Sequence, residues 1–136
     1  GLREALRIVL EEGLMPRVER HYRNALALGE GLEALGLSLV VPRDCRLPQV
    51  TVVAIPDGVD DVRTRVELLN RYGIEIGRGL GEFAGKVWRI GLMGESSKAE
   101  HVYAILAALE DILPSLGYEV PRGAGVAAAS QTLANS

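Results

Sequence analysis

Residues 79–94 read GLGEFAGKVWRIGLMG, a glycine-rich loop that leads into a short apolar segment carrying one arginine. If that segment is a strand, its side chains alternate between two faces. The large apolar residues then share the face that we expect to point into the core: Trp88, Ile90 and Leu92. Arg89 falls on the opposite face, between the slim or small residues Val87 and Gly91.

An arginine held rigidly on a strand is well suited to bind a carboxylate through two parallel hydrogen bonds. Two structural interpretations compete with this one: Arg89 could form an internal salt bridge, or it could lie on an edge strand. Strand context alone favours these structural interpretations. The apolar flanks of Arg89, and a glycine loop that would let a ligand approach the backbone closely, favour a binding site.

Hydrophobic periodicity upstream of this stretch predicts two helices. The first covers residues 2–12, and the second has Pro16 in its first turn and Gly36 as its stop. A short apolar run over residues 37–41 predicts a strand, and a run rich in β-branched residues over 49–55 predicts a clearer one.

A Pro-Asp-Gly turn at residues 56–58 leads into a third helix, which we expect to end at Gly73. Either Asp60 or Asp61 can cap its N-terminus. The apolar stripe of this helix consists of Val62, Val66 and Leu69. A further short strand is expected over residues 74–76, just before the glycine loop.

Residues 97–100, SKAE, match a capping box and open a last helix, which Pro114 and Gly117 would end. The order of elements predicts an α+β fold with a small, mainly antiparallel sheet and helices packed on one face. We expect residues 1–120 to form this domain. The segment 121–136 is rich in Ala, Gly and Ser, which predicts a flexible tail.

Composition excludes several classes of function. The chain has 136 residues, a formal net charge of -3 with both signs interspersed, and no basic block typical of nucleic-acid binding. No apolar run is long enough to predict a membrane span. The single cysteine, Cys45, predicts a reducing, cytoplasmic location. The chain begins within a helical pattern, with no cap before Leu2, so we expect it to be part of a longer protein.

The residues that usually carry chemistry are few. His21 and His101 lack the spacing of metal ligands, so we predict no metal site. The lysines, Lys86 and Lys98, are expected on the surface, and neither resembles a desolvated nucleophilic amine. The loop over residues 77–81 fails as a dinucleotide-binding fingerprint because no helix follows it. We therefore predict no catalytic or cofactor-binding residue within this chain.

Three segments together closely resemble the C-terminal small domain of the alanine–glyoxylate aminotransferases, which are class V pyridoxal-phosphate enzymes: YGIEI at 72–76, GLG at 79–81 and GKVWRIGLMG at 85–94. The resemblance extends from the first helix to about Gly117 and implies the small domain of a type I pyridoxal-phosphate aminotransferase fold. It implies that Arg89 binds the α-carboxylate of the substrate, with Gly79 and Gly81 bordering it. Two loop residues depart from the family pattern, which usually has a small residue at Arg78 and often a proline at Glu82.

The resemblance also implies what must come from elsewhere. Transamination needs a Schiff-base lysine, a carboxylate paired with the pyridinium nitrogen and a phosphate-binding cup. The family supplies these from a large domain that the chain lacks, so this chain alone is expected to be inactive. The parent enzyme is expected to be a homodimer that uses pyridoxal phosphate to transfer an amino group from alanine or serine to glyoxylate.

Two alternatives of other classes remain at this point. The chain could be a free-standing α+β module that binds a carboxylate for sensing or regulation. It could also be an interaction domain whose uncovered sheet face is an interface.

Overall fold

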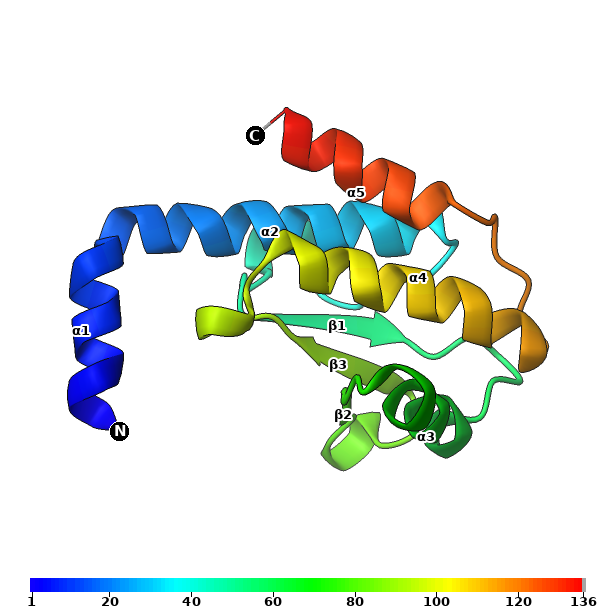
Figure 1. Ribbon diagram of the computed structural model, residues 1–136. Helices are drawn as coiled ribbons and strands as arrows, with labels where there is room; N and C mark the ends of the chain where they lie inside the picture. The colour runs from blue at the N-terminus through cyan, green and yellow to red at the C-terminus, as the bar shows by residue number, and fades with distance from the viewer. Residues whose placement is uncertain (136) are drawn as a thin grey trace.

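A three-stranded antiparallel sheet lies at the centre of the computed structural model, which describes residues 1–135 (Figure 1). The strand order is β1-β3-β2, so β3 lies between its two neighbours. The strands are β1 Val50–Ala54, β2 Gly77–Arg78 and β3 Val87–Gly91. The α-helices of residues 1–135 are α1 Leu2–Glu12, α2 Leu14–Ala34, α3 Asp61–Tyr72, α4 Ala99–Ser115 and α5 Ala124–Ala134. Three short 3-10 turns are η1 Arg43–Cys45, η2 Gly81–Phe83 and η3 Gly94–Ser96.

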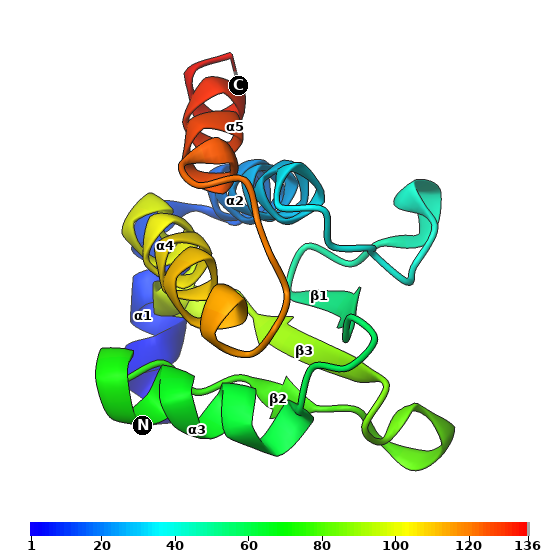
Figure 2. The same cartoon turned by 90° about the vertical axis from the view of Figure 1, so that its right-hand side faces the viewer.

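The helices form one layer and the sheet another, which confirms the α+β prediction. Figure 2 shows α2, α4 and α3 following one another along one side of the sheet, with α5 outside α2. The side chains of Trp88, Ile90 and Leu92 are buried in the core, as the alternation predicts. Opposite Trp88 in the ladder is Val53, which is also fully buried. Helices α2 and α4 supply much of the remaining core, through Leu28, Leu32, Leu106, Leu109 and Ile112.

Helix α1 turns sharply away from α2 and projects from the body of the molecule (Figure 1). Gly13 forms the corner with a φ of +84°, a conformation that glycine adopts without strain. Glu12 holds the corner by accepting hydrogen bonds of 2.5 Å from both Arg17 and Arg20. These two guanidinium groups, Arg20 first, lower the pKa of Glu12 to about 2.

Helix α3 is capped as the sequence predicts, but it presents a different face to the core. Of the two candidate caps the structure selects Asp60, whose Oδ1 accepts from the backbone N–H of Arg63 at 2.7 Å. The expected apolar stripe of Val62, Val66 and Leu69 is exposed, and Leu68 and Thr64 are buried instead. The physical reason lies in Asp61 at the start of α3, whose Oδ1 accepts from Nε1 of Trp88 at 3.0 Å and sets the rotation of the helix.

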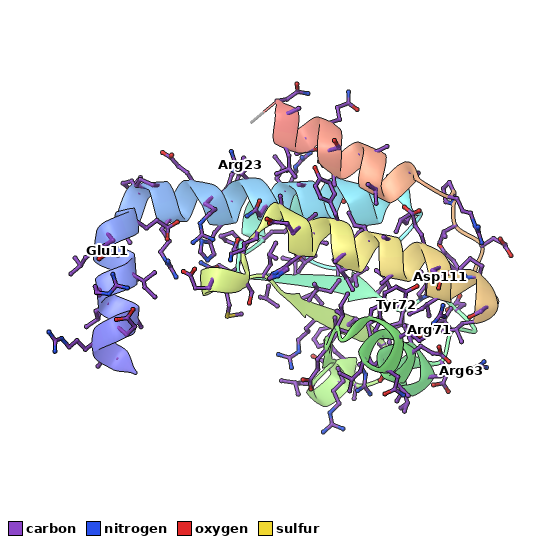
Figure 3. The ribbon with its side chains drawn as sticks, in the orientation of Figure 1. Glu11, Arg23, Arg63, Arg71, Tyr72 and Asp111 are labelled. Atoms are coloured by element: carbon purple, nitrogen blue, oxygen red, sulfur yellow. The ribbon has the colours of Figure 1, made fainter. Side chains whose placement is uncertain are left out.

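The end of α3 is tied to α4 by polar contacts. Figure 3 shows Arg71, Tyr72 and Asp111 gathered where the two helices meet. The hydroxyl of Tyr72 donates to Oδ2 of Asp111 at 2.6 Å, and the guanidinium of Arg71 binds the same oxygen. The Tyr72 hydroxyl, together with Arg71, lowers the pKa of Asp111. Gly73 then ends α3 in the left-handed region, as predicted.

The structure corrects two of the expected strands. Residues 37–41 form a single bridge, Leu39 to Val53, instead of a strand. Residues 74–76 are not a strand, and β2 begins just after them at Gly77. Pairing with β3 decides the position of β2, because only Gly77 and Arg78 reach the partners Arg89 and Trp88.

The predicted capping box at residues 97–100 is also wrong. The N-cap of α4 is Lys98, which makes no side-chain cap hydrogen bond. Ser97 is fully buried, and its Oγ accepts from Nδ2 of Asn24 at 3.3 Å instead of capping the helix. The side chain of Asn24 on α2 therefore binds the Ser97 hydroxyl that the capping-box motif would place at the start of α4.

The prediction of a flexible tail over 121–136 is wrong for residues 124–134, which form α5 against α2. Small residues allow the two helices to approach closely: a Cβ placed on Gly31 would lie 3.0 Å from the carbonyl oxygen of Gly125. The carboxylate of Glu110 on α4 accepts from the backbone N–H of Gly123 at 2.6 Å and anchors the start of α5. Ser136 lies outside the described residues.

Candidate functional site

Arg89 lies on the central strand β3, on the sheet face that points away from the helices. Its cross-strand neighbours are Val52 on β1 and Gly77 on β2. Directly paired residues share a face in an antiparallel sheet. The half-buried Arg89 side chain therefore lies between a β-branched residue on one side and a bare backbone on the other.

The backbone of β2 holds the guanidinium of Arg89. Nε of Arg89 donates to the carbonyl oxygen of Arg78 at 2.9 Å. A Cβ on Gly77 would lie 3.2 Å from Nη2 of Arg89, so glycine leaves room for the side chain to cross β2. This hydrogen bond uses the Nε–H of the guanidinium. The N–H groups of Nη1 and Nη2 at its outer edge can still donate in parallel to the two oxygens of a carboxylate.

This environment argues against both structural interpretations of Arg89. The residue is on the central strand, not on an edge. Within residues 1–135, no Asp or Glu oxygen comes within ion-pair distance of its guanidinium. A half-buried cation without an internal counter-charge on a face that no helix of the described chain covers is a candidate site for an external anion.

Gly79 and Gly81 lie in the hairpin between β2 and β3 and do different things there. The N–H of Gly79 donates to the carbonyl of Val87 at 3.0 Å, so it closes the hairpin and is not directed at a ligand. A Cβ on Gly79 would lie 1.9 Å from the carbonyl oxygen of Phe83. Gly81 opens η2 with a φ of +55° and is exposed, with no other group against it.

The glycine that directly touches Arg89 is Gly77, which sequence reasoning does not single out as a site residue. The contact between Gly77 and Arg89 can be recognised only when the register of the β2–β3 hairpin is known. That register depends on η2 inside the connecting loop, and no local sequence rule predicts it. The signal present in the sequence is the alternation Gly77-Arg78-Gly79, which places the two glycines on one face of an extended segment.

Beyond Arg89, the open face of the sheet is mainly apolar. Val50 and Val52 of β1 lie on this face and also line a pocket between α2 and the edge strand β1. Apolar residues of that pocket include Ala25 and Leu39, and its charged lining residues are Arg43 and Arg46. On the other side of Gly91 in the chain, Met93 continues the face and is exposed. The guanidinium therefore projects from an apolar surface, where charge–charge contacts are stronger than in bulk water.

The structure also places the other candidate groups of the sequence. Lys86 and Lys98 are exposed. His21 is buried and makes only structural hydrogen bonds, and His101 is exposed with Nδ1 2.7 Å from the carbonyl of Ser96. No group of potential metal ligands occurs in the part of the chain that the structure describes. No helix among residues 1–135 is long and apolar enough to cross a membrane.

No protein-family model matches the chain. Among curated proteins, the (S)-ureidoglycine–glyoxylate transaminase of Bacillus subtilis is 44% identical over 136 residues, which is 100% of this chain and 33% of that protein. The serine–glyoxylate aminotransferase of Arabidopsis thaliana is 38% identical over 134 residues, 98% of this chain and 33% of that protein. The chain thus spans about a third of the length of the curated relatives it matches.

Solved structures that resemble the chain are also aminotransferases. The ureidoglycine–glyoxylate aminotransferase of Bacillus subtilis superposes with a TM-score of 0.94 at 44% identity, covering 98% of this chain and 35% of that one. An alanine–glyoxylate aminotransferase from Nostoc sp. gives a TM-score of 0.80 at 53% identity, covering 82% of this chain and 30% of that one. In sequence and in fold the chain matches the C-terminal third of the class V pyridoxal-phosphate aminotransferases of the glyoxylate type.

Proposed function

We propose that this chain provides the substrate-carboxylate site of an aminotransferase that passes an amino group from an amino acid, alanine or serine, to glyoxylate. The observation that carries the proposal is the Arg89 guanidinium, held on the central strand and without an ion pair among residues 1–135. The names of several relatives support glyoxylate as the acceptor and differ in the donor, whereas one relative is named for pyridoxamine and pyruvate. Amino and oxo acid substrates share a carboxylate, so a single arginine can serve both halves of the reaction.

The geometry supports a role for Arg89 in binding and orienting the substrate. The bond from Nε to the Arg78 carbonyl fixes the plane of the guanidinium before a ligand arrives. A bound carboxylate then meets two N–H donors in a fixed orientation, which directs the reacting carbon toward one place. Because Arg89 is half-buried, we expect loss of this hydrogen-bonded charge pair to cost binding free energy at the lower end of the about 2–5 kcal/mol that buried pairs show.

The hairpin with Gly79 and Gly81 belongs to the same proposal as a border of the substrate site. Gly79 packs against the Phe83 carbonyl and sets the shape of the hairpin. Exposed Gly81 leaves the rim of the hairpin without a side chain, where a ligand can approach the backbone.

The chemistry of transamination is assigned to parts outside this chain. Pyridoxal phosphate supplies the carbonyl group and electron sink on which amino transfer depends. Because Lys86 and Lys98 do not fit the Schiff-base role, we place the lysine, the pyridinium partner and the phosphate cup in a large domain, and expect this chain alone to be inactive. The proposal also includes a homodimeric parent enzyme and, from the single exposed free thiol of Cys45, a cytoplasmic location.

Kinetics of the intact enzyme that carries this chain test the proposal. Arg89→Ala is expected to raise the KM for glyoxylate on the order of a hundredfold, because the carboxylate loses its charged partner. Arg78→Ala is the matched control, since it removes a neighbouring arginine side chain but keeps the carbonyl that holds Arg89. Equal KM values in the two variants would contradict a carboxylate-binding role for Arg89.

A free-standing carboxylate sensor is the second candidate, favoured by the fact that the groups holding Arg89 all come from this chain. Calorimetric titration of the 136-residue chain with alanine, serine and glyoxylate separates the two. Saturable binding without pyridoxal phosphate supports the sensor, and its absence supports the aminotransferase domain.

A further inference from the structure

Three side chains of α2 hold the loop that follows β3, and we call them the α2 clamp: Arg20, His21 and Asn24. Nε2 of His21 accepts from the backbone N–H of Gly94 at 2.8 Å. Nη1 of Arg20 donates to the carbonyl oxygens of Gly94 at 3.1 Å and of Ser97 at 2.6 Å. Nδ2 of Asn24 also donates to the Ser97 carbonyl, at 2.9 Å. Both peptide groups of Gly94 are therefore fixed by buried or half-buried groups on one helix.

The hydrogen bonds of His21 define its protonation state. Its Nδ1 lies 2.7 Å from the carbonyl oxygen of Arg17, which can only accept, so Nδ1 carries the proton. Nε2 must then keep its lone pair in order to accept from Gly94. A second proton on Nε2 would bring two N–H groups against each other and break this contact.

The clamp connects to the open sheet face through Met93. Met93 has extended backbone angles, φ -139° and ψ 155°, so it continues the alternation of β3 on the face of Arg89 and Gly91. A Cβ on Gly91 would lie 3.6 Å from Cε of Met93, so the thioether end of Met93 lies beside Gly91, which is the next residue after Arg89 on the same face of β3. The peptide bond between Met93 and Gly94 is the one whose N–H His21 holds.

We propose that His21 is a positioning residue, which holds the Met93–Gly94 peptide so that the Met93 side chain forms one wall of the Arg89 carboxylate site. It does so only as a neutral imidazole. This inference rests on the proposed function of Arg89. It predicts that affinity for a substrate carboxylate falls when the Gly94 N–H loses the acceptor that His21 provides.

Several other charged groups surround the clamp and must be separated from His21. They are Glu11 and Glu12 on α1, Arg17 and Arg20 on α2, Glu95 on η3, and Lys98 and His101 at the start of α4. Arg17 pairs with Glu12 at 2.5 Å and with Glu95 at 3.6 Å. His101→Gln is the matched control, because His101 is an exposed histidine whose Nδ1 lies 2.7 Å from the carbonyl oxygen of Ser96.

The experiment measures KM and kcat for glyoxylate in the intact enzyme. His21→Gln keeps an oxygen acceptor for the Gly94 N–H, so its KM is expected to stay near the native value. His101→Gln is also expected to keep the native KM. His21→Leu removes the acceptor and is expected to raise KM about fivefold, with kcat little changed.

Met93→Ala tests the route by which His21 acts. Because both residues shape the same wall, the KM effect of Met93→Ala is not expected to add to that of His21→Leu. Full additivity, or a KM of His21→Leu equal to that of the native enzyme, would overturn the inference. If His21→Leu fails to fold in a thermal melt, the exposed Met93 decides, since an unchanged KM in Met93→Ala overturns the inference. Arg89→Ala in the same assay separates the two claims, since an unchanged KM there defeats the proposed function itself.

Discussion

Replacement of Gly79 by alanine should distort the hairpin between β2 and β3 far more than its small size suggests. The new Cβ would lie 1.9 Å from the carbonyl oxygen of Phe83, 2.6 Å from its carbonyl carbon and 3.0 Å from Cγ2 of Val87. Two of these atoms are backbone, so no rotamer change relieves the contact. The peptide group of Phe83 has to move.

The cost follows from the hydrogen bonds that this movement breaks. The Phe83 carbonyl accepts from the N–H of Lys86 at 3.0 Å, and the N–H of Gly79 donates to the Val87 carbonyl at 3.0 Å. Each such bond contributes about 1 kcal/mol, and overpacking adds about 1–3 kcal/mol. We expect Gly79→Ala to lower the free energy of unfolding by about 3 kcal/mol.

Gly81→Ala is a matched control in the same hairpin. Gly81 has a φ of +55°, and nothing lies within 4 Å of a Cβ placed on it. Only the strain of a left-handed residue remains, which costs about 1 kcal/mol. Urea unfolding followed by circular dichroism measures both variants. Equal midpoints for Gly79→Ala and Gly81→Ala would refute the view that the Phe83 carbonyl confines Gly79.

Two further predictions concern other parts of the fold. Gly31→Ala should destabilise the contact of α2 with α4 and α5 by about 1–3 kcal/mol, because its Cβ would lie 2.4 Å from Cδ1 of Leu106 and 3.0 Å from the carbonyl oxygen of Gly125; an unchanged urea midpoint would contradict this packing. Arg20 is the main cause that lowers the pKa of Glu12 to about 2, so the charged form is favoured in the folded state. The resulting stability is present above the ordinary glutamate pKa and is lost as the pH falls from about 4.5 toward about 2; the melting temperatures of the native chain and of Glu12→Gln should therefore converge over that range, and a constant difference would contradict it.

The position of Arg89 follows from local sequence pattern, and the structure places it as alternation predicts. A single strand with large apolar residues at every second position has one possible core face, so Trp88 fixes where Arg89 points. Gly73 and Asp60 likewise mark the ends of α3 through purely local capping rules.

The errors arise where a distant residue decides the outcome. The α3 stripe of Val62, Val66 and Leu69 is exposed because Trp88 on β3 binds Asp61 and sets the rotation of the helix. The Ala- and Gly-rich segment that forms α5 has no clear alternation of large apolar and polar residues, so local pattern does not predict a buried face. Its packing against α2 depends on Gly31, which is far away in the sequence. The contact of Gly77 with Arg89 depends on hairpin register, which local patterns do not specify.

The central claim, that Arg89 binds the carboxylate of the substrate, is tested most directly by changing the arginine and the carboxylate together. The kcat/KM of the intact enzyme is measured for glyoxylate and for its uncharged amide, in the native protein, Arg89→Ala and Arg78→Ala. We expect Arg89→Ala to reduce the preference for the charged substrate on the order of a hundredfold, while Arg78→Ala keeps it. An Arg89→Ala enzyme that still prefers glyoxylate as strongly as the native enzyme would contradict a carboxylate-binding role for Arg89.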